Sequence, residues 1–469
     1  MRPSPRFTLW VLAVVFVFGF ATSSFGQQPN DPQAAAAVAS GGPSYAQKVP
    51  VDTTSVAGVP SAGASLTFDA VTGAVISGGP GNANVNTQAG VQSGNDDNFD
   101  TDDTRPNTPT IAGLDTLATF DGAFFAQAGP NSTGLKLFRF TMIGNDPQRG
   151  DTTVIPFKID QVSLQLLNAD GTTFQVVSFD PFQQRTLESP NFEPLNYRSG
   201  HGIEYADAVH RAQFFQVMDK DWHTLLIPKV VNKVTIVVPR FVNVQLSNGT
   251  IIQARSYFTE TAADGSTFVL MLNLLFNFFF DNEVVNDINN GLFTTNALNA
   301  TLFPNTFLFS LNVNNPNVPG GCCTLGFHTF FFQPGAIPQP RWITQYASWI
   351  SPGIFGGGFQ DVTALSHETS EEFGDPFLDN VTPLWQFPGQ PANSHVCQGN
   401  LEQGDPIEVL PNATTSITVH EGSFKFTYHP QNIPLLQWFE MGTTSNAIDG
   451  AFSFPDETVL PHSALPCPP

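Results

Sequence analysis

The sequence predicts an α+β fold in which the strands of a mixed sheet precede one helix that carries metal-ligating side chains. Two observations lead to this prediction. Apolar residues in period two, or in short continuous runs, mark several strands between residues 162 and 349. Beyond them, the stretch from Ser366 to Pro376 gathers four carboxylates around one histidine. A low-complexity stretch ahead of the first strand predicts a disordered spacer before the folded domain.

Residues 1–26 have the order of a secretory signal peptide. Arg2 and Arg6 precede an apolar run over residues 7–20, and small residues follow as far as Gly26. This run is shorter than the roughly 20 residues that span a bilayer. We therefore expect cleavage near Gly26, which predicts a secreted, extracellular or periplasmic protein with no membrane span after cleavage. The alternative is an uncleaved membrane anchor.

Residues 27–112 are expected to form a low-complexity, flexible spacer. Ala, Gly, Ser, Pro, Asn and Asp dominate this segment, and large apolar residues are sparse. Such a segment buries too little apolar surface to offset the entropy lost on ordering. Its Asn/Asp cluster at residues 95–98 lacks the ligand spacing of a calcium loop. The folded α+β domain is expected over residues 113–469.

The chain is acidic but sparsely charged. It has 18 Lys and Arg against 40 Asp and Glu, a formal net charge of −22, and only 12% charged residues. Nucleic acid, a polyanion, is repelled by such a chain, so we expect no nucleic-acid partner. Phe contributes 44 residues. A Phe-rich core under a polar, weakly charged surface suits an extracellular protein.

The four cysteines are Cys322, Cys323, Cys397 and Cys467. Four cysteines allow three pairings, and export permits disulfides. The adjacent Cys322 and Cys323 do not have the spacing of a zinc ribbon. Structural disulfides are therefore favoured over metal ligation or redox chemistry.

The expected elements begin with a hairpin, in which residues 162–166 and 174–177 flank the turn signal Asp170-Gly171. Residues 205–215 are expected as a helix, because apolar residues recur there at three- and four-residue steps. The apolar run at residues 268–280 is expected as a buried strand or a core helix. Further strands are expected at residues 234–238, 306–313, 325–332 and 342–349.

The helix that carries the chemistry is expected to follow the last of these strands. Asp361 is its expected N-cap, and Gly374 is a suitable end. His367 and Glu371 are four residues apart, so both side chains lie on one helix face. Zinc metallopeptidases use this geometry in His-Glu-x-x-His. Here Glu371 occupies the position of the second histidine, and a carboxylate oxygen also ligates zinc.

A metal site needs at least one further ligand. Asp375 lies at the end of the expected helix, one turn beyond Glu371. Downstream, a turn supplies Glu402 and Asp405, and Cys397 lies just before it. A glutamate well downstream is the third ligand in one class of zinc peptidases, which makes Glu402 a candidate.

Two residues are candidates for roles beside the ligands. Glu368 follows His367 directly, and in peptidases this position holds the general base. His328 is on the expected strand at residues 325–332 and is a candidate for positioning substrate or for an extra ligand. The alternative for His328, among several Phe residues, is a satisfied core histidine.

The same residues carry a resemblance to a known family. The chain resembles uncharacterised secreted bacterial proteins that have a His-Glu-x-x-Glu-x-x-x-Asp-Pro signature and a later Glu-x-Gly-Asp, and the match covers about residues 140–465. In this motif it is also similar to the plant exordium, or phosphate-induced, family, and more distantly to zincins. The matching positions are Ser366-His367-Glu368, Glu371, Asp375-Pro376-Phe377, Asn380, Pro383, Trp385, Leu401-Glu402, Gly404-Asp405-Pro406, Gly326-Phe327-His328, Tyr205-Ala206-Asp207-Ala208 and Arg211-Ala212-Gln213-Phe214.

The resemblance implies a zincin-like domain, and two functions are expected as alternatives. The first is a secreted metal-dependent hydrolase, peptidase-like, in which His367, Glu371 and Glu402 or Asp375 hold zinc and Glu368 is the general base. The second is a non-catalytic extracellular protein in which the same cluster holds a structural calcium or zinc ion. One nitrogen ligand among carboxylates also suits a harder cation than zinc.

Overall fold

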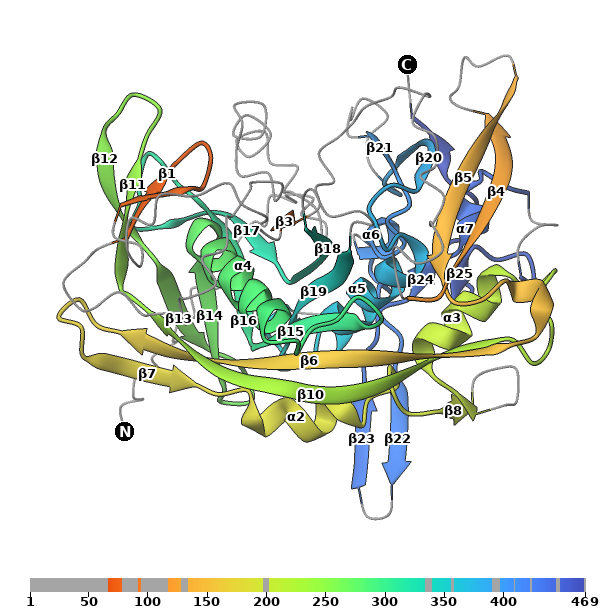
Figure 1. Ribbon diagram of the computed structural model, residues 1–469, viewed down its shortest axis with the longest axis horizontal. Helices are drawn as coiled ribbons and strands as arrows, with labels where there is room; N and C mark the ends of the chain where they lie inside the picture. Colours follow the sequence, from red (N-terminus) through yellow and green to blue (C-terminus); the bar gives the residue numbers. More distant parts are fainter. Residues whose placement is uncertain are drawn as a thin grey trace, which may run out of the picture.

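The computed structural model describes residues 66–77, 92–93, 117–127, 134–196, 202–333, 340–355, 358–389, 397–408, 410–421, 424–443 and 448–467. Within these residues the protein is a strand-rich α+β structure with mixed sheets, as the sequence predicts (Figure 1). No helix in this part of the chain is long and apolar enough to cross a membrane. The expected signal peptide at residues 1–26 lies outside the described residues.

A mixed seven-stranded sheet forms the centre of the described structure. Its strands, in order across the sheet, are β10 (His223–Val238), β6 (Thr152–Leu167), β15 (Leu298–Pro304), β19 (Arg341–Trp349), β18 (Gly326–Phe332) and β3 (Gln92–Ser93), with β7 (Thr173–Val177) paired to β6. The first four strands are parallel to one another. Strand β18 is antiparallel to β19 and lies near one edge.

Two four-stranded sheets, one three-stranded sheet (β21, β20 and β26) and four strand pairs complete the β structure of the described residues. In one four-stranded sheet the strand order is β13 (Tyr257–Thr261), β14 (Thr267–Leu272), β16 (Thr306–Leu311) and β17 (Pro319–Thr324). In the other it is β12 (Ile251–Arg255), β11 (Phe241–Gln245), β1 (Thr67–Asp69) and β2 (Val75–Ser77). The remaining strands are β4 (Thr119–Gln127), β5 (Leu135–Ile143), β8 (Leu195–Asn196), β9 (Gly202–Ile203), β20 (Val381–Gln386), β21 (Cys397–Asn400), β22 (Ile417–Glu421), β23 (Phe424–Tyr428), β24 (Ile433–Pro434), β25 (Ser453–Phe454) and β26 (Leu465–Pro466).

The helices are short except for two that pack on the central sheet. They are η1 (Pro147–Arg149), α2 (Asp180–Leu187), α3 (Tyr205–Gln213), α4 (Asn273–Asn289), α5 (Thr363–Gly374), α6 (Asp405–Glu408) and α7 (Leu436–Phe439). Helix α5 packs against β18, β19 and α3. Helix α4 is drawn in green across the sheet strands in Figure 1.

The two long helices cover opposite faces of the central sheet. Successive side chains of a strand point to opposite faces. On β18, Phe327 and Phe331 contact Phe280 of α4, with ring centroids 5.0 and 6.2 Å apart. His328, which lies between them in the chain, instead contacts carboxylates of α5. The face that a strand residue occupies therefore decides which helix it meets.

The expected secondary structure agrees with the described structure in most places. The expected strands correspond to parts of β6, β7, β10, β16, β18 and β19, and the expected helix at residues 205–215 is α3. Strands β6 and β7 pair antiparallel around Gly171, whose φ is +81°. The apolar run at residues 268–280 is divided between two elements, because it ends β14 and begins α4.

Part of the expected spacer is folded. Strand β1 pairs in parallel with β11, and β2 pairs with β1. Leu66 and Phe68 are buried in the same core as α4, at 1% and 0% exposure. The expectation of a flexible spacer is therefore wrong for residues 66–77, because Leu66 and Phe68 alternate with Thr67 and give one strand face enough apolar area to bury. Apart from these residues and β3, the expected spacer lies outside the described residues as far as residue 112.

The start of α5 also differs from the expected N-cap. Val362 is the capping residue, without a side-chain hydrogen bond, and Asp361 has a φ of +46°. The Asp361 carboxylate accepts hydrogen bonds from the backbone N–H groups of Val362 and His429, and lies 2.7 Å from the His429 Nδ1. The Asp361 carboxylate, which was expected to cap the helix, therefore binds His429 instead.

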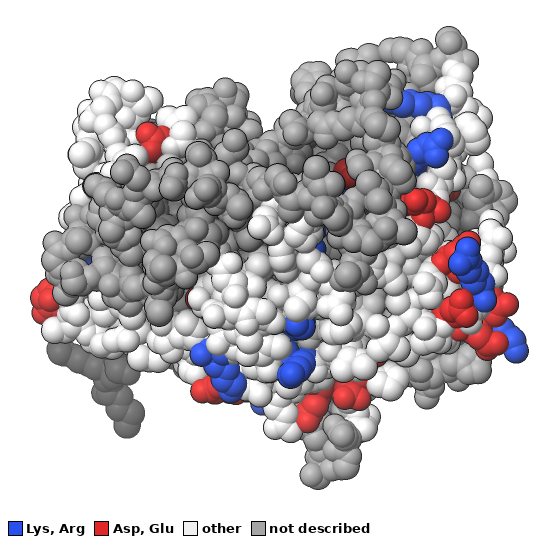
Figure 2. All heavy atoms as spheres, viewed as in Figure 1, with Lys and Arg blue, Asp and Glu red and all other residues white. Residues whose placement is uncertain are grey.

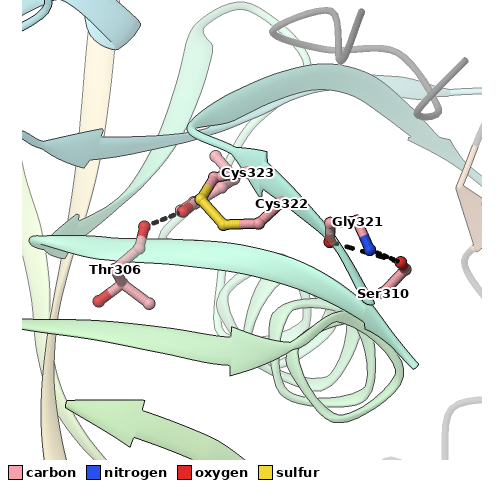
Figure 3. The surroundings of a disulfide bond; sticks show 6 residues. Thr306, Ser310, Gly321, Cys322 and Cys323 are labelled. Atoms are coloured by element: carbon pink, nitrogen blue, oxygen red, sulfur yellow. Dashed lines mark hydrogen bonds between the residues drawn. A yellow bond between two sulfur atoms is a disulfide. The ribbon is translucent and has the colours of Figure 1, made fainter. Parts of the chain in front are cut away.

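The cysteines form two pairs. Cys322 pairs with Cys323, and Cys397 pairs with Cys467 across 70 residues of sequence. Disulfides are thus confirmed over metal ligation by these residues. Figure 3 shows the first pair on β17, with Ser310 nearby, whose Oγ accepts a hydrogen bond from the Gly321 N–H at 2.7 Å. The second pair fixes β21, directly ahead of the turn that carries Glu402.

Few charged side chains lie on the face drawn in Figure 2, and most of its described surface is uncharged. Many acidic residues are instead inside the protein. Eight of the buried carboxylates lie on or next to α4, α5 and α6, namely Glu283, Asp287, Glu368, Glu371, Glu372, Asp375, Glu402 and Asp405. Since buried carboxylates are costly unless they are paired or hold a cation, these residues are where a function is expected.

Substitution of Phe68 tests the packing of β1. Phe68→Ala removes a fully buried aromatic ring, and we expect it to lower the free energy of unfolding by about 3–5 kcal/mol. The control is Phe125→Ala, because Phe125 is 66% exposed and should change stability by about 0.5 kcal/mol or less. Denaturant unfolding of both variants makes the comparison. Equal midpoints for Phe68→Ala and wild type would show that β1 contributes no packing.

His210 gives α3 a pH-sensitive contact with α5. Its ring lies 5.3 Å from that of Phe373 and is 1% exposed. Its Nε2 lies 3.0 Å from the Ile143 carbonyl oxygen. Burial lowers the pKa of His210 to about 3, although the Ile143 carbonyl partly offsets this effect.

This pKa predicts a loss of stability in acid. An unfolded histidine has a pKa of about 6.5, so between pH 6.5 and 3 the unfolded chain binds a proton that the folded chain excludes. From pH 7 to 5, we expect wild type to lose about 2 kcal/mol of stability relative to His210→Gln. Unfolding curves at several pH values measure this difference, with His462→Gln as the exposed-histidine control. Parallel pH profiles for wild type and His210→Gln would contradict the prediction.

Candidate metal centre

Helix α5 places its polar side chains inside the protein. All twelve of its residues are buried, including His367, Glu368 and Glu371 at 0% exposure. The helix packs between the central sheet and α3. On the sheet side, the Gln345 Nε2 donates to Glu372 Oε2 at 2.7 Å. That contact turns Glu372 toward the sheet. The carboxylates of Glu368 and Glu371 do not take part in it.

The first group of converging atoms joins α5 to α6. The His367 Nε2 lies 3.2 Å from Glu371 Oε1 and 3.7 Å from Asp405 Oδ1. The ligand atoms of these three residues all lie within 4.8 Å of one another. His367 and Glu371 are thus brought together as their spacing predicts, and Asp405 joins them from the downstream turn.

The second group joins α5 to the central sheet. The His328 Nδ1 lies 3.2 Å from Glu371 Oε2 and 3.7 Å from Glu368 Oε2. These three residues also have ligand atoms within 4.8 Å of one another. Glu371 therefore lies between the two histidines and presents one carboxylate oxygen to each.

The spacing of these atoms resembles that of metal ligands. Atoms held about 2.0–2.1 Å from a tetrahedral zinc ion lie about 3.3 Å from one another. The contact between His328 Nδ1 and Glu371 Oε2 has this length, but both atoms lack a hydrogen bond in the described part of the chain. Both oxygens of Glu368 and the Oδ1 of Asp405 lack one as well. Buried polar atoms without partners are rare in native proteins, so the donor set fits a cation.

Gln431 orients His367 within this arrangement. The Gln431 Nε2 donates to the Gly404 carbonyl oxygen at 2.5 Å, so its Oε1 faces the His367 Nδ1 at 3.0 Å. The Nδ1 of His367 therefore carries a proton that the Gln431 Oε1 accepts, and the Nε2 is the nitrogen that would ligate a metal ion between Glu371 and Asp405. A hydrogen bond of this kind on the far nitrogen is the usual support of a metal-binding histidine.

Two glycines let backbone approach the cluster. The Gly404 N–H donates to Glu371 Oε1 at 2.9 Å, and a Cβ at this position would overlap the His367 ring. A Cβ at Gly326 of β18 would overlap the Glu368 carboxylate. Both positions need glycine because the His367 ring and the Glu368 carboxylate fill the space that a side chain would take.

The pKa values reflect a buried excess of carboxylates. Burial alone lowers the pKa of His367, but Glu371 and Glu368 outweigh it and raise this pKa to about 9. Burial raises the pKa of Glu371, but His367 and His328 outweigh it and hold this pKa near 2. Burial raises the pKa of Glu368 to about 8 and that of Asp405 well above its usual range. In the described residues, histidines are the only cationic partners of these carboxylates.

Two of the expected ligands, Asp375 and Glu402, are in neither converging group. Asp375 is buried, and its carboxylate accepts hydrogen bonds from the backbone N–H groups of Asp379 and Asn380 at 3.0–3.2 Å. It thereby organises the turn after α5 and is in neither converging group. Glu402 is 1% exposed and close enough to raise the pKa values of His328 and Asp405, but it too is outside both groups.

Helix α3 supports the centre from behind. The Tyr205 hydroxyl donates to the Gln431 carbonyl oxygen. Gln213 Oε1 accepts from the Gln403 Nε2 at 2.5 Å, on the turn that carries Glu402 and Asp405. Gln431 was not among the candidate residues from the sequence, and Gly404 appeared there only as a matching position of the resemblance. Gln431 lies 64 residues from His367, and a lone Gln carries no local signal.

Comparison of the chain with models of known protein families, with curated proteins and with solved structures gives no match.

Loss of the Gln431 amide should weaken metal binding. We expect Gln431→Leu to reduce zinc affinity about 10–100-fold, because the His367 Nδ1 loses the acceptor that fixes the ring. Gln431→Glu keeps an acceptor there and should retain more affinity. The control is Gln437→Leu, a buried Gln that donates to the Gln213 carbonyl oxygen instead. Competition with a chromophoric chelator measures each affinity, and wild-type affinity in Gln431→Leu would exclude the orienting role.

Proposed function

We propose that this chain is a secreted metal-dependent hydrolase, peptidase-like, built on a zincin-like domain. The observation that carries the proposal is the convergence of two histidine nitrogens on Glu371, each 3.2 Å from one of its oxygens. The antiparallel strand β18 beside α5 also supports the zincin-like assignment. Secretion is supported by the residue order of the first 26 residues and by the paired cysteines.

The ligands in this proposal are His367 and Glu371, completed by Asp405 or His328. We propose Asp405 or His328 rather than Glu402 or Asp375, because their ligand atoms converge with Glu371. Zinc suits a set that contains imidazole nitrogen as well as carboxylate oxygen. When bound, zinc would supply the Lewis acidity that polarises a substrate carbonyl.

Glu368 is the proposed general base. Its Oε2 lies 3.7 Å from the His328 Nδ1, and its Oε1 lies 4.0 Å from the His367 Nε2. Both oxygens lack a hydrogen bond in the described residues, so they are available to a water molecule. In hydrolysis, Glu368 accepts a proton from the attacking water and returns it to the leaving group as the scissile bond breaks. Gln431 keeps His367 in the tautomer that the centre requires.

The second candidate function is a non-catalytic extracellular protein whose centre holds a structural zinc or calcium ion. Complete burial favours it, because His367, Glu368 and Glu371 are 0% exposed and a substrate must reach the ligands. In this alternative the ion holds α5, β18 and α6 together, and Glu368 is a ligand rather than a base.

Two substitutions separate these functions. In the hydrolase, Glu368→Gln should keep the metal and lower turnover by about 100-fold or more, because proton transfer is lost. His367→Ala should lose the metal. The matched control is Glu372→Gln, on the same helix but bonded to Gln345. Activity is measured on a broad panel of peptides and esters, with metal content determined on every variant.

The outcomes of this experiment exclude one another. Metal-replete wild type that cleaves nothing would support the structural ion. Full activity in Glu368→Gln would exclude Glu368 as the base. Wild type that binds neither zinc nor calcium, even after refolding with each ion, would refute both functions.

A further inference from the structure

A second group of buried carboxylates lies on the other face of the central sheet. It comprises Asp160 of β6 with Glu283 and Asp287 of α4, and we call it the α4 cluster. The ligand atoms of these three residues all lie within 4.8 Å of one another. Their exposures are 0%, 2% and 0%. Glu283 and Asp287 are four residues apart, so they project from one face of α4.

The sheet brings further polar side chains to the α4 cluster. Asp160 is in register with Asn232 of β10 on one side and with Thr301 of β15 on the other. Side chains in register on neighbouring strands leave the sheet on the same face. The Asn232 Nδ2 donates to Glu283 Oε1 at 3.1 Å and to Asp287 Oδ1 at 2.9 Å. Asn232 thus fixes the two helix carboxylates beside Asp160.

Several oxygens in this cluster have no hydrogen-bond partner within the described chain. They are both oxygens of Asp160, the Oδ2 of Asp287 and the hydroxyl of Thr301, which is itself 0% exposed. The Thr301 hydroxyl and the carboxylates of Asp160 and Asp287 thus all offer lone pairs that no described donor accepts. A group that binds lone pairs from both a hydroxyl and carboxylates would complete the site. A cation is such a group, since hydroxyl and carboxylate oxygens are ligands of hard cations.

No positive side chain compensates the cluster in the described residues. Asp160, Glu283 and Asp287 form no ion pair there with Lys, Arg or His. Lys158, two residues before Asp160 on the same strand, pairs with none of them. Without a cation, burial raises the pKa of Asp160 well above its usual range, and Asp287 and Glu283 add to this effect. Burial likewise raises the pKa of Asp287 to about 7.

We propose that the α4 cluster is a second metal site, selective for calcium, with Asp160, Glu283, Asp287 and the Thr301 hydroxyl as ligands. All of these ligands are oxygens, which favours a hard cation over zinc. Three carboxylates, mono- or bidentate, with one hydroxyl match the six to eight oxygens of calcium. Magnesium keeps several water molecules, and a fully buried site between helix and sheet disfavours that. The bound ion would fix α4 to β6 and β15.

Calcium-dependent stability tests this site in the full-length protein. After chelation, addition of calcium to wild type should restore one bound calcium ion per chain and raise the thermal midpoint by a few degrees. Asp160→Asn keeps the shape of the side chain but removes its charge, and it should abolish both effects. Thr301→Val should weaken calcium binding. His367→Ala is the matched control, because it removes a ligand of the other centre and should leave the calcium response intact.

The alternative is that the carboxyl groups share protons and bind no ion. In that case calcium leaves the wild-type midpoint unchanged, and Asp160→Asn is as stable as wild type or more stable. This outcome would overturn the proposal, as would a calcium response that disappears in His367→Ala and persists in Asp160→Asn. If Asp160→Asn does not fold, Asp287→Asn provides the same comparison. An equal response to magnesium and calcium would refute the selectivity.

Discussion

The burial of α5 is the constraint on which the arrangement of this protein depends. A carboxylate transferred from water into a protein interior costs several kcal/mol unless hydrogen bonds or opposite charge offset the loss of hydration. Helix α5 carries Glu368, Glu371 and Glu372 into the interior together. Gln345 donates to one oxygen of Glu372, and the backbone N–H of Gly404 donates to one oxygen of Glu371. The remaining charge has only two histidines beside it in the described residues, so the fold leaves a place for a cation.

The spacing of residues within one helix could be predicted from the sequence, but contacts between distant segments could not. His367 and Glu371 converge because a four-residue step fixes their relative position. The third ligand depended on a turn of unknown direction, where Glu402 and Asp405 were both available. Close approach of the Gly404 backbone to Glu371 brings Asp405 to His367. For Gln431 no sequence pattern gave a signal, because its role arises only when the chain returns to α5.

Strand parity explains both the place of His328 beside α5 and the absence of the α4 cluster from the predicted sites. Phe327 and His328 are neighbours, but one faces α4 and the other faces α5. On β6, Ile159 and Asp160 divide in the same way, with Ile159 in the core beside α5. An aspartate inside an apolar strand was a visible signal that one face of the sheet holds a polar group. Its partners could not be inferred, because Glu283 and Asp287 belong to a helix whose first half resembles a strand in composition.

The two clusters have different chemistry because their ligand atoms differ. The centre at α5 contains imidazole nitrogen, lies beside a carboxylate without a partner, and has a Gln that sets one tautomer. These are the features that a site needs to move protons as well as to hold a metal. The α4 cluster contains only oxygen and has no histidine in the described residues. This cluster therefore has no described imidazole to transfer protons near neutral pH, whereas a fixed cation there would stabilise the packing of α4. In the two proposals, the central sheet therefore separates a hydrolytic centre on one face from a structural ion on the other.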